Sequence, residues 1–100
     1  FITGLSGIDY IGSMSTEIAT HRRKIDELDA QILDLIQQRV TEAILIRQLK
    51  QAENIPLFTP EREQSLIQKL IEKSSGRLAP QVVKDIWQTI ILGGKQTTSI

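Results

Sequence analysis

Three cationic residues, Arg22, Arg39 and Lys50, fall within one long predicted helix and could bind an anionic ligand. At about 100° per residue, Arg39 and Lys50 lie about 20° apart on one face of that helix and roughly 16 Å apart along its axis. Arg39 interrupts an apolar stripe, where a charged group is unfavourable unless it meets an anionic partner. Because a guanidinium group binds a carboxylate through two parallel hydrogen bonds, this face suggests a small anionic ligand.

Arg22 stands apart from the other two cations. It lies about 25 Å from Arg39 along the helix axis and roughly 100° around the helix, so one chain cannot easily bring both to one small ligand. If all three cations serve one pocket, Arg22 must come from a second copy of the chain. Taken alone, Arg22 belongs to the basic run His21–Lys24, which is also typical of a solvated helix face.

A second group of polar residues, Thr59, Arg62 and Glu63, opens the next predicted helix. Thr59 is a favourable N-cap, and Pro60 suits the first helical position. Arg62 and Glu63 are also ordinary residues for a first helical turn. Together with the cations of the long helix, however, they would place three arginines and a lysine near one cavity, which suggests a small dianion such as a dicarboxylate.

The elements that position these residues are predicted to be three helices of very unequal length, which makes the fold all-α. They run from about 16 to 51, from 60 to about 73 and from 80 to about 98. Their apolar residues recur at three- and four-residue steps, and no segment shows the alternation of a strand. The apolar faces consist of Ile18, Ile25, Leu28, Ile32, Leu35, Ile36, Val40, Ile44 and Ile46, then Leu66, Ile67, Leu70 and Ile71, and finally Val83, Ile86, Trp87, Ile90 and Ile91.

The length of the first helix predicts a dimer. Some 36 helical residues span about 54 Å, whereas a compact chain of this size has a radius of gyration near 12–13 Å. The far half of the helix would leave its apolar face in water unless a partner covered it, so we expect an obligate, intertwined homodimer. A plain coiled coil is the alternative, but the apolar pattern drifts between 3.5 and 3.6 residues and two more apolar helices follow.

Composition excludes several classes of protein. Twelve basic and twelve acidic residues give no net charge to attract nucleic acid, and four aromatic residues give no stacking platform. With no cysteine and one histidine, neither a disulfide framework nor a Cys/His zinc site can form, and no metal is expected. No apolar run approaches about 20 residues and no secretory signal is visible, which favours a cytoplasmic protein without a membrane partner.

Residues 1–13 differ from the rest of the chain. They hold three of the six glycines and end in Gly12 and Ser13, directly before Met14. We therefore interpret residues 1–13 as an expression-tag leader and residues 14–100 as one helical domain. The alternative is a natural apolar arm that packs on the dimer.

The ordered set of charged residues resembles a known family. The pattern of the all-helical chorismate mutases is similar to an ordered set in this chain. The set consists of Arg22, Ile25, Asp29, Arg39 and Lys50, followed by Pro60-Glu61-Arg62-Glu63. The resemblance covers residues 16 to about 98. In that family two chains interlock through the long helix, and each of two sites takes one arginine from the opposite chain. Arg22 occupies the position of that arginine.

The resemblance implies a Claisen rearrangement of chorismate to prephenate, a step of aromatic amino-acid biosynthesis that needs no cofactor and no covalent intermediate. Arg39 and the partner's Arg22 would clamp the two carboxylates of the substrate. Lys50 would donate to the ether oxygen, where negative charge develops as the C–O bond breaks.

The resemblance also implies roles at the start of the second helix. Glu63 would accept a hydrogen bond from the ring hydroxyl of the substrate, with help from the backbone of Thr59. Arg62 would support the carboxylate-binding network. Many members of the family have an acidic residue where this chain has Thr59, so recognition of the ring substituent departs from the common pattern.

The last helix departs from the family as well. The family usually has Gln or Glu there as a second donor to the ether oxygen, and counting without gaps puts Thr98 at that position. Gln96 would lie roughly 200° away on a regular helix. We expect Thr98 to act as a weaker donor, unless Gly93 and Gly94 distort the helix and bring Gln96 to the substrate. Gly94 is itself expected to contact the substrate.

Two other functions remain open. Related proteins on this scaffold eliminate pyruvate from isochorismate or rearrange 4-amino-4-deoxychorismate, and Glu63 is the residue that distinguishes them. A carboxylate facing the ring substituent fits the hydroxyl of chorismate, whereas these relatives tend to carry an apolar residue there. The third possibility is a non-catalytic helical dimer that binds a ligand or partner through the same pocket.

Overall fold

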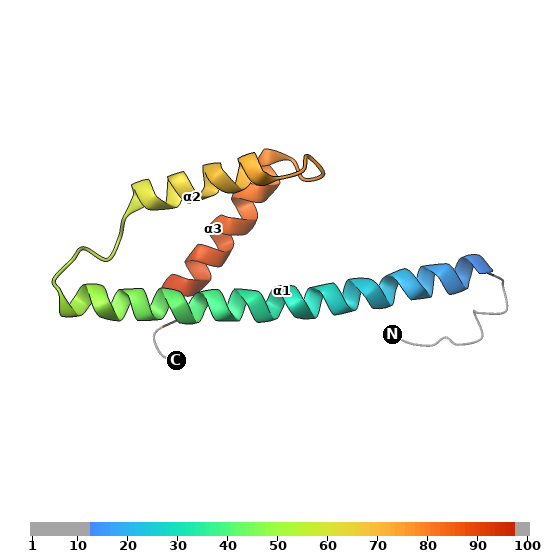
Figure 1. Ribbon diagram of the computed structural model, residues 1–100, viewed down its shortest axis with the longest axis horizontal. Helices are drawn as coiled ribbons and strands as arrows, with labels where there is room; N and C mark the ends of the chain where they lie inside the picture. Colours follow the sequence, from blue (N-terminus) through green and yellow to red (C-terminus); the bar gives the residue numbers. More distant parts are fainter. Residues whose placement is uncertain (1–12, 98–100) are drawn as a thin grey trace. The chain divides into compact units, whose positions relative to one another are not determined.

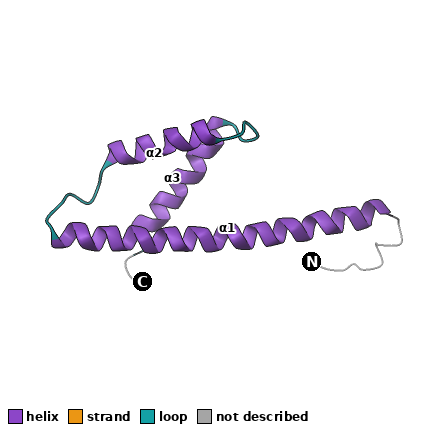
Figure 2. Cartoon of the chain, in the orientation of Figure 1, coloured by secondary structure: helices purple, strands orange, loops and turns teal. Residues whose placement is uncertain are grey.

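A computed structural model of the chain describes residues 13–97, which form three α-helices and no strand. Helix α1 spans Ser13–Ala52, α2 spans Pro60–Lys73 and α3 spans Pro80–Gln96 (Figures 1 and 2). The predicted all-α fold with one long and two shorter helices is confirmed. Helix α1 begins a few residues earlier than predicted, at Ser13. The rest of the predicted leader, residues 1–12, lies outside the described residues.

The chain divides into two units, residues 1–35 and residues 36–100. The described part of the first unit is the N-terminal portion of α1. Its apolar stripe is open to solvent in the single chain: the five side chains are between 47% and 62% exposed, and they are Ile18, Ile25, Leu28, Ile32 and Leu35. An apolar stripe of this length on one helix indicates an interaction surface.

Among the described residues the hydrophobic core lies in the second unit, and each helix contributes one well-buried hydrophobic side chain to it. Ile44, Ile67 and Val83 are 3%, 8% and 3% exposed. The predicted apolar face of α2 is buried or half-buried throughout, and that of α3 is so except at Ile86. In this unit α3 runs from the end of α2 back toward α1 (Figure 1). Since a three-residue core is small, further burial in an assembly would stabilise the fold.

The end of α1 is closed by the loop that follows it. Asn54 adopts a left-handed conformation with φ 58°, which asparagine tolerates better than most residues. The Ile55 N–H then donates to the Lys50 carbonyl at 2.8 Å, and the Asn54 N–H to the Gln51 carbonyl at 3.4 Å. This pair of bonds is the Schellman arrangement, and it orders the last turn of α1, which carries Lys50.

Helix α2 begins at Pro60 with Thr59 at the N-cap, both as predicted. The Thr59 side chain makes no capping hydrogen bond. Instead its backbone carbonyl accepts from the N–H groups of Arg62, at 3.0 Å, and Glu63, at 3.3 Å. Thr59 (φ −131°, ψ 85°) therefore caps α2 through its backbone carbonyl and not through its side chain.

The glycine pair does not break α3, which stays helical through Gly93 and Gly94 to Gln96. Thr97 is extended, with φ −88° and ψ 126°, so the helix stops short of the predicted end near 98. The Thr97 hydroxyl donates to the Gly93 carbonyl at 3.0 Å and closes the last turn. Thr98 itself lies outside the described residues.

Candidate active site

A cavity of about 310 Å³ opens in the second unit between the three helices. Six of its lining residues are among those predicted to form the site: Arg39, Lys50, Thr59, Arg62, Glu63 and Gly94. The structure therefore brings together the candidates from the end of α1, the start of α2 and the end of α3. The remaining lining residues are Glu42, Ala43, Ile46, Arg47, Leu57, Leu66, Ile91 and Lys95.

The cavity wall is strongly cationic, although the whole chain carries no net charge. Five cationic and two acidic side chains line it, a formal excess of three positive charges. Arg39 and Lys50 are half-buried, whereas Arg62 is exposed at the rim. A concave surface of one sign raises the local concentration of ligands of the opposite sign. The arrangement therefore suits a small ligand with more than one negative charge.

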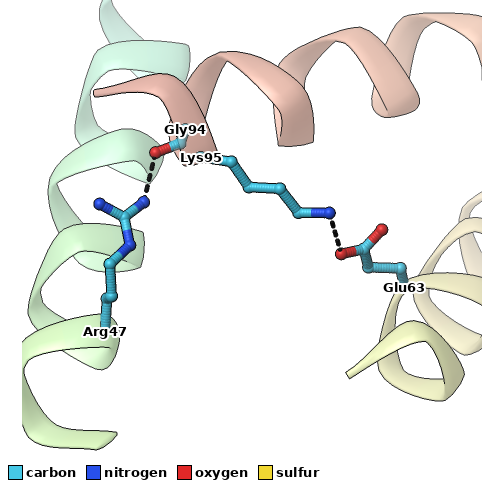
Figure 3. A network of polar contacts seen from close by, with 4 residues as sticks. All are labelled: Arg47, Glu63, Gly94 and Lys95. Atoms are coloured by element: carbon cyan, nitrogen blue, oxygen red, sulfur yellow. Dashed lines mark hydrogen bonds and ion pairs between the residues drawn. The ribbon is translucent and has the colours of Figure 1, made fainter. Parts of the chain in front are cut away.

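Glu63 forms an ion pair across the cavity wall that the sequence did not predict. The Lys95 Nζ lies 2.8 Å from the Glu63 Oε2 (Figure 3). The same ammonium lies 4.3 Å from the centroid of the Phe58 ring, within the range of a cation–π interaction. One signal could have identified Lys95: it follows Ile91 by four residues and so continues the apolar stripe of α3, as Arg39 does on α1.

Arg47 is a second lining residue that the sequence analysis did not single out. Its guanidinium donates to the Gly94 carbonyl at 2.6 Å and to the Thr97 carbonyl at 2.7 Å (Figure 3 shows the Gly94 bond). Gly94 is buried, and a Cβ built on it would lie 3.8 Å from the Ala43 Cβ. Arg47 thus fastens the end of α3 to α1 by satisfying carbonyls that the helix end leaves without intrahelical partners.

We expect Arg47→Met to lower the free energy of unfolding by about 1–2 kcal/mol, because two hydrogen bonds from a charged, half-buried donor are lost. Urea unfolding at one fixed protein concentration measures the change. Arg23→Met is the matched control, since within residues 13–97 Arg23 bonds only the exposed Thr20 hydroxyl, at 3.3 Å, and should change stability by less than about 0.5 kcal/mol. Equal unfolding midpoints for the two variants would contradict the assigned role of Arg47.

Among the described residues, two predicted site residues, Arg22 and Gln96, are not part of the cavity lining. Arg22 belongs to the first unit, where its side chain is exposed. Gln96 is exposed, and because α3 remains regular, the distortion that would have brought it to the cavity is absent from the described helix. The position of Thr98 is not described.

The described part of the chain shows neither a cluster of metal ligands nor a candidate membrane span. Among residues 13–97, no three His, Cys, Asp or Glu side chains gather closely enough to hold a metal ion. None of the described helices is long and apolar enough to cross a membrane.

Comparison with known proteins gives consistent matches. The family model for chorismate mutase type II matches residues 21–97. A bifunctional chorismate mutase/prephenate dehydratase from Aquifex aeolicus (strain VF5) is 30% identical over 79 residues. That match covers 75% of this chain but only 22% of the relative, so the chain spans about a fifth of the length of that protein.

Solved structures show the same fold. Form I of chorismate mutase from Thermus thermophilus superposes with a TM-score of 0.76 at 20% identity, covering 78% of this chain and 98% of that one. Form II of the same enzyme superposes with a TM-score of 0.78, also at 20% identity, covering 82% and 93%. At this level of identity the likeness establishes the three-helix architecture.

Proposed function

The chain belongs to the type II chorismate mutase family, and on that premise we propose that it catalyses the rearrangement of chorismate to prephenate. The observation that carries the proposal is the cationic cavity, in which Arg39, Lys50 and Glu63 meet. The reaction is intramolecular: one C–O bond breaks while one C–C bond forms, and no atom or electron is exchanged with a second reactant. The site therefore has to bind and orient the substrate and to stabilise the charge that develops during the reaction.

Orientation is the first task, because chorismate must fold into a compact conformer before its reacting carbons can meet. Two carboxylates held at fixed points restrict the substrate to such a conformer, which removes much of the entropic part of the barrier. Arg39 would bind one carboxylate, with Arg62 at the rim supporting the network. The second carboxylate would meet Arg22 of a second chain.

Charge stabilisation is the second task. As the C–O bond breaks, negative charge grows on the ether oxygen, and Lys50 is proposed to donate a hydrogen bond there. Such a bond is stronger in the transition state than in the bound substrate, so it raises kcat and not only affinity. The closed end of α1 supports this role, since it orders the turn that carries Lys50.

Recognition of the ring hydroxyl is assigned to Glu63. A carboxylate can only accept hydrogen bonds, which suits a hydroxyl donor. The Thr59 hydroxyl makes no capping bond to α2, so it can turn toward a ligand in the cavity that it lines. Gly94, also at the cavity wall, would let the substrate approach the backbone of α3. Any second donor to the ether oxygen would come from Thr98 rather than from Gln96.

We infer that the site is completed in a homodimer. The exposed apolar stripe of the first unit lies on the same helix as Arg22, so a second copy that covers the stripe would also meet Arg22. Covering this stripe removes large apolar side chains from water, which favours association.

We expect the wild-type protein to sediment as a dimer at micromolar concentration. Ile32→Asp should raise the dissociation constant of the dimer at least ~100-fold, because each chain would bury an unpaired carboxylate in the interface. Analytical ultracentrifugation over a concentration series measures both. Ala30→Asp adds the same charge to a different, exposed face of α1 and serves as the control. A wild-type chain that stays folded and monomeric would contradict the dimer.

The direct test of function is an assay with purified protein and chorismate in the absence of added cofactors. We expect chorismate to disappear and prephenate to form, identified by chromatography and mass. Isochorismate and 4-amino-4-deoxychorismate are offered separately. Release of pyruvate from isochorismate, without turnover of chorismate, would replace the proposed reaction with a lyase reaction. Binding without any product would indicate a non-catalytic module.

A further inference from the structure

Two contacts hold the Lys95 side chain at the wall of the cavity. It lies on α3, its Nζ is 2.8 Å from the Glu63 Oε2 of α2, and the ring of Phe58 from the connecting loop lies under the same ammonium at 4.3 Å. The Glu63 side chain is 28% exposed and that of Lys95 is 44% exposed, so the pair is partly shielded and still reachable from the cavity.

The ion pair occupies one oxygen of the Glu63 carboxylate and leaves the other for a ligand. Within the described residues, Lys95 is the one partner of the Glu63 carboxylate, and it engages Oε2. A carboxylate has two acceptor oxygens, so Oε1 remains to accept a hydrogen bond from a ligand. The Phe58 ring helps to hold the Lys95 ammonium, and the ammonium in turn limits where the Glu63 carboxylate can turn.

The same pair determines which donor Oε1 should accept. A neutral hydroxyl needs an acceptor but no net negative charge. A protonated amine gains most from an unpaired carboxylate, and an aliphatic amine is largely protonated at neutral pH. With the Lys95 ammonium 2.8 Å from Glu63, the net charge of the pair is zero, and a second cation beside it would be repelled by Lys95.

We propose that Lys95 is a positioning and specificity-determining residue that orients and neutralises Glu63, so that the site prefers a ring carrying a hydroxyl over one carrying an ammonium group. The inference rests on the proposed function, and it deepens that function by naming the substituent that the site selects. It accounts for the placement of a lysine in the apolar stripe of α3, beside the one acidic residue that is assigned to the ring.

The test compares chorismate with 4-amino-4-deoxychorismate as substrates and competing ligands. In Lys95→Met, which keeps the apolar stem and removes the charge, we expect the ratio of kcat/KM for the two compounds to shift about tenfold toward the amine. Lys95→Arg keeps a cation that can pair with Glu63 and should retain most of the wild-type ratio. Lys84→Met, on an exposed site of α3 that does not line the cavity, is the matched control and should leave the ratio unchanged.

A double variant separates positioning from a direct effect on the ligand. In the Glu63→Gln background, Lys95→Met should change kcat/KM for chorismate much less than it does in the wild type, because there is no carboxylate left for Lys95 to orient. An undiminished change would show that Lys95 acts on the ligand itself and would overturn the positioning role. An unchanged ratio in Lys95→Met, with folding verified by circular dichroism, would overturn the specificity role.

The role of Lys95 can be tested even if the proposed function is wrong. If the wild-type protein does not turn over chorismate, the proposed function fails, and calorimetry then gives the ratio of the dissociation constants of the two compounds directly. A shift of that ratio in Lys95→Met and not in Lys84→Met would still support selection by Lys95. No shift would overturn the inference independently of catalysis.

Discussion

Lys50→Met is expected to lower kcat by about 10²–10³-fold and to change KM for chorismate far less. The proposed hydrogen bond to the ether oxygen strengthens only as the C–O bond breaks, and loss of such a donor removes roughly 3–4 kcal/mol of transition-state stabilisation. Methionine keeps much of the apolar stem of the half-buried lysine, so the fold should persist. Steady-state kinetics over a chorismate concentration series measures both constants.

The control for this variant is Lys73→Met. Lys73 is exposed in the last turn of α2 and does not line the cavity, so the same chemical change there should leave kcat unchanged. Near-normal turnover in a correctly folded Lys50→Met protein would remove the proposed mechanism. A non-catalytic binding module would then become the better description of the cavity.

Mixing two inactive variants is expected to restore activity if each site is shared between chains. Arg22→Ala and Lys50→Ala should each be nearly inactive as homodimers. After co-refolding, half of the dimers contain one chain of each kind, and each mixed dimer has one site with both residues intact. The mixture should therefore regain roughly a quarter of wild-type activity, as expected for two equivalent sites related by twofold symmetry.

The matched control mixes Arg39→Ala with Lys50→Ala. Both residues line the same cavity within residues 36–100, so every site in a mixed dimer of these variants lacks one of them. This mixture should stay inactive. Native mass spectrometry verifies that mixed dimers form in both experiments. Mixed Arg22→Ala/Lys50→Ala dimers that remain inactive would show that Arg22 does not enter the site from the second chain.

The three helices could be predicted from the sequence because their signals are local. Apolar residues at three- and four-residue steps mark each helix, and Pro60 and Pro80 mark the first positions of α2 and α3. The predicted end of α2 near residue 73 is also confirmed, since the helix ends at Lys73 and Gly76 then adopts φ 92°. These helix starts and ends depend on residues only a few positions apart, and the structure confirms them.

Part of the candidate site was predictable for the same reason. The helical repeat alone places Arg39 and Lys50 on one face of α1, and the first turn of α2 necessarily presents Arg62 and Glu63 near Thr59. All five line one cavity in the structure. Their roles toward the substrate remain predictions that the variants above test.

Tertiary structure alone decided how the ends of the helices meet. In the sequence, Arg47 is one more cation of α1, yet its partners are carbonyls of Gly94 and Thr97 at the far end of the chain. Lys95 is a lysine in a final helical turn, a common place for one, yet it pairs with Glu63 on another helix. A hydrogen bond or ion pair needs its atoms within about 3 Å, and only the packing of α3 against the rest of the second unit brings these atoms so close.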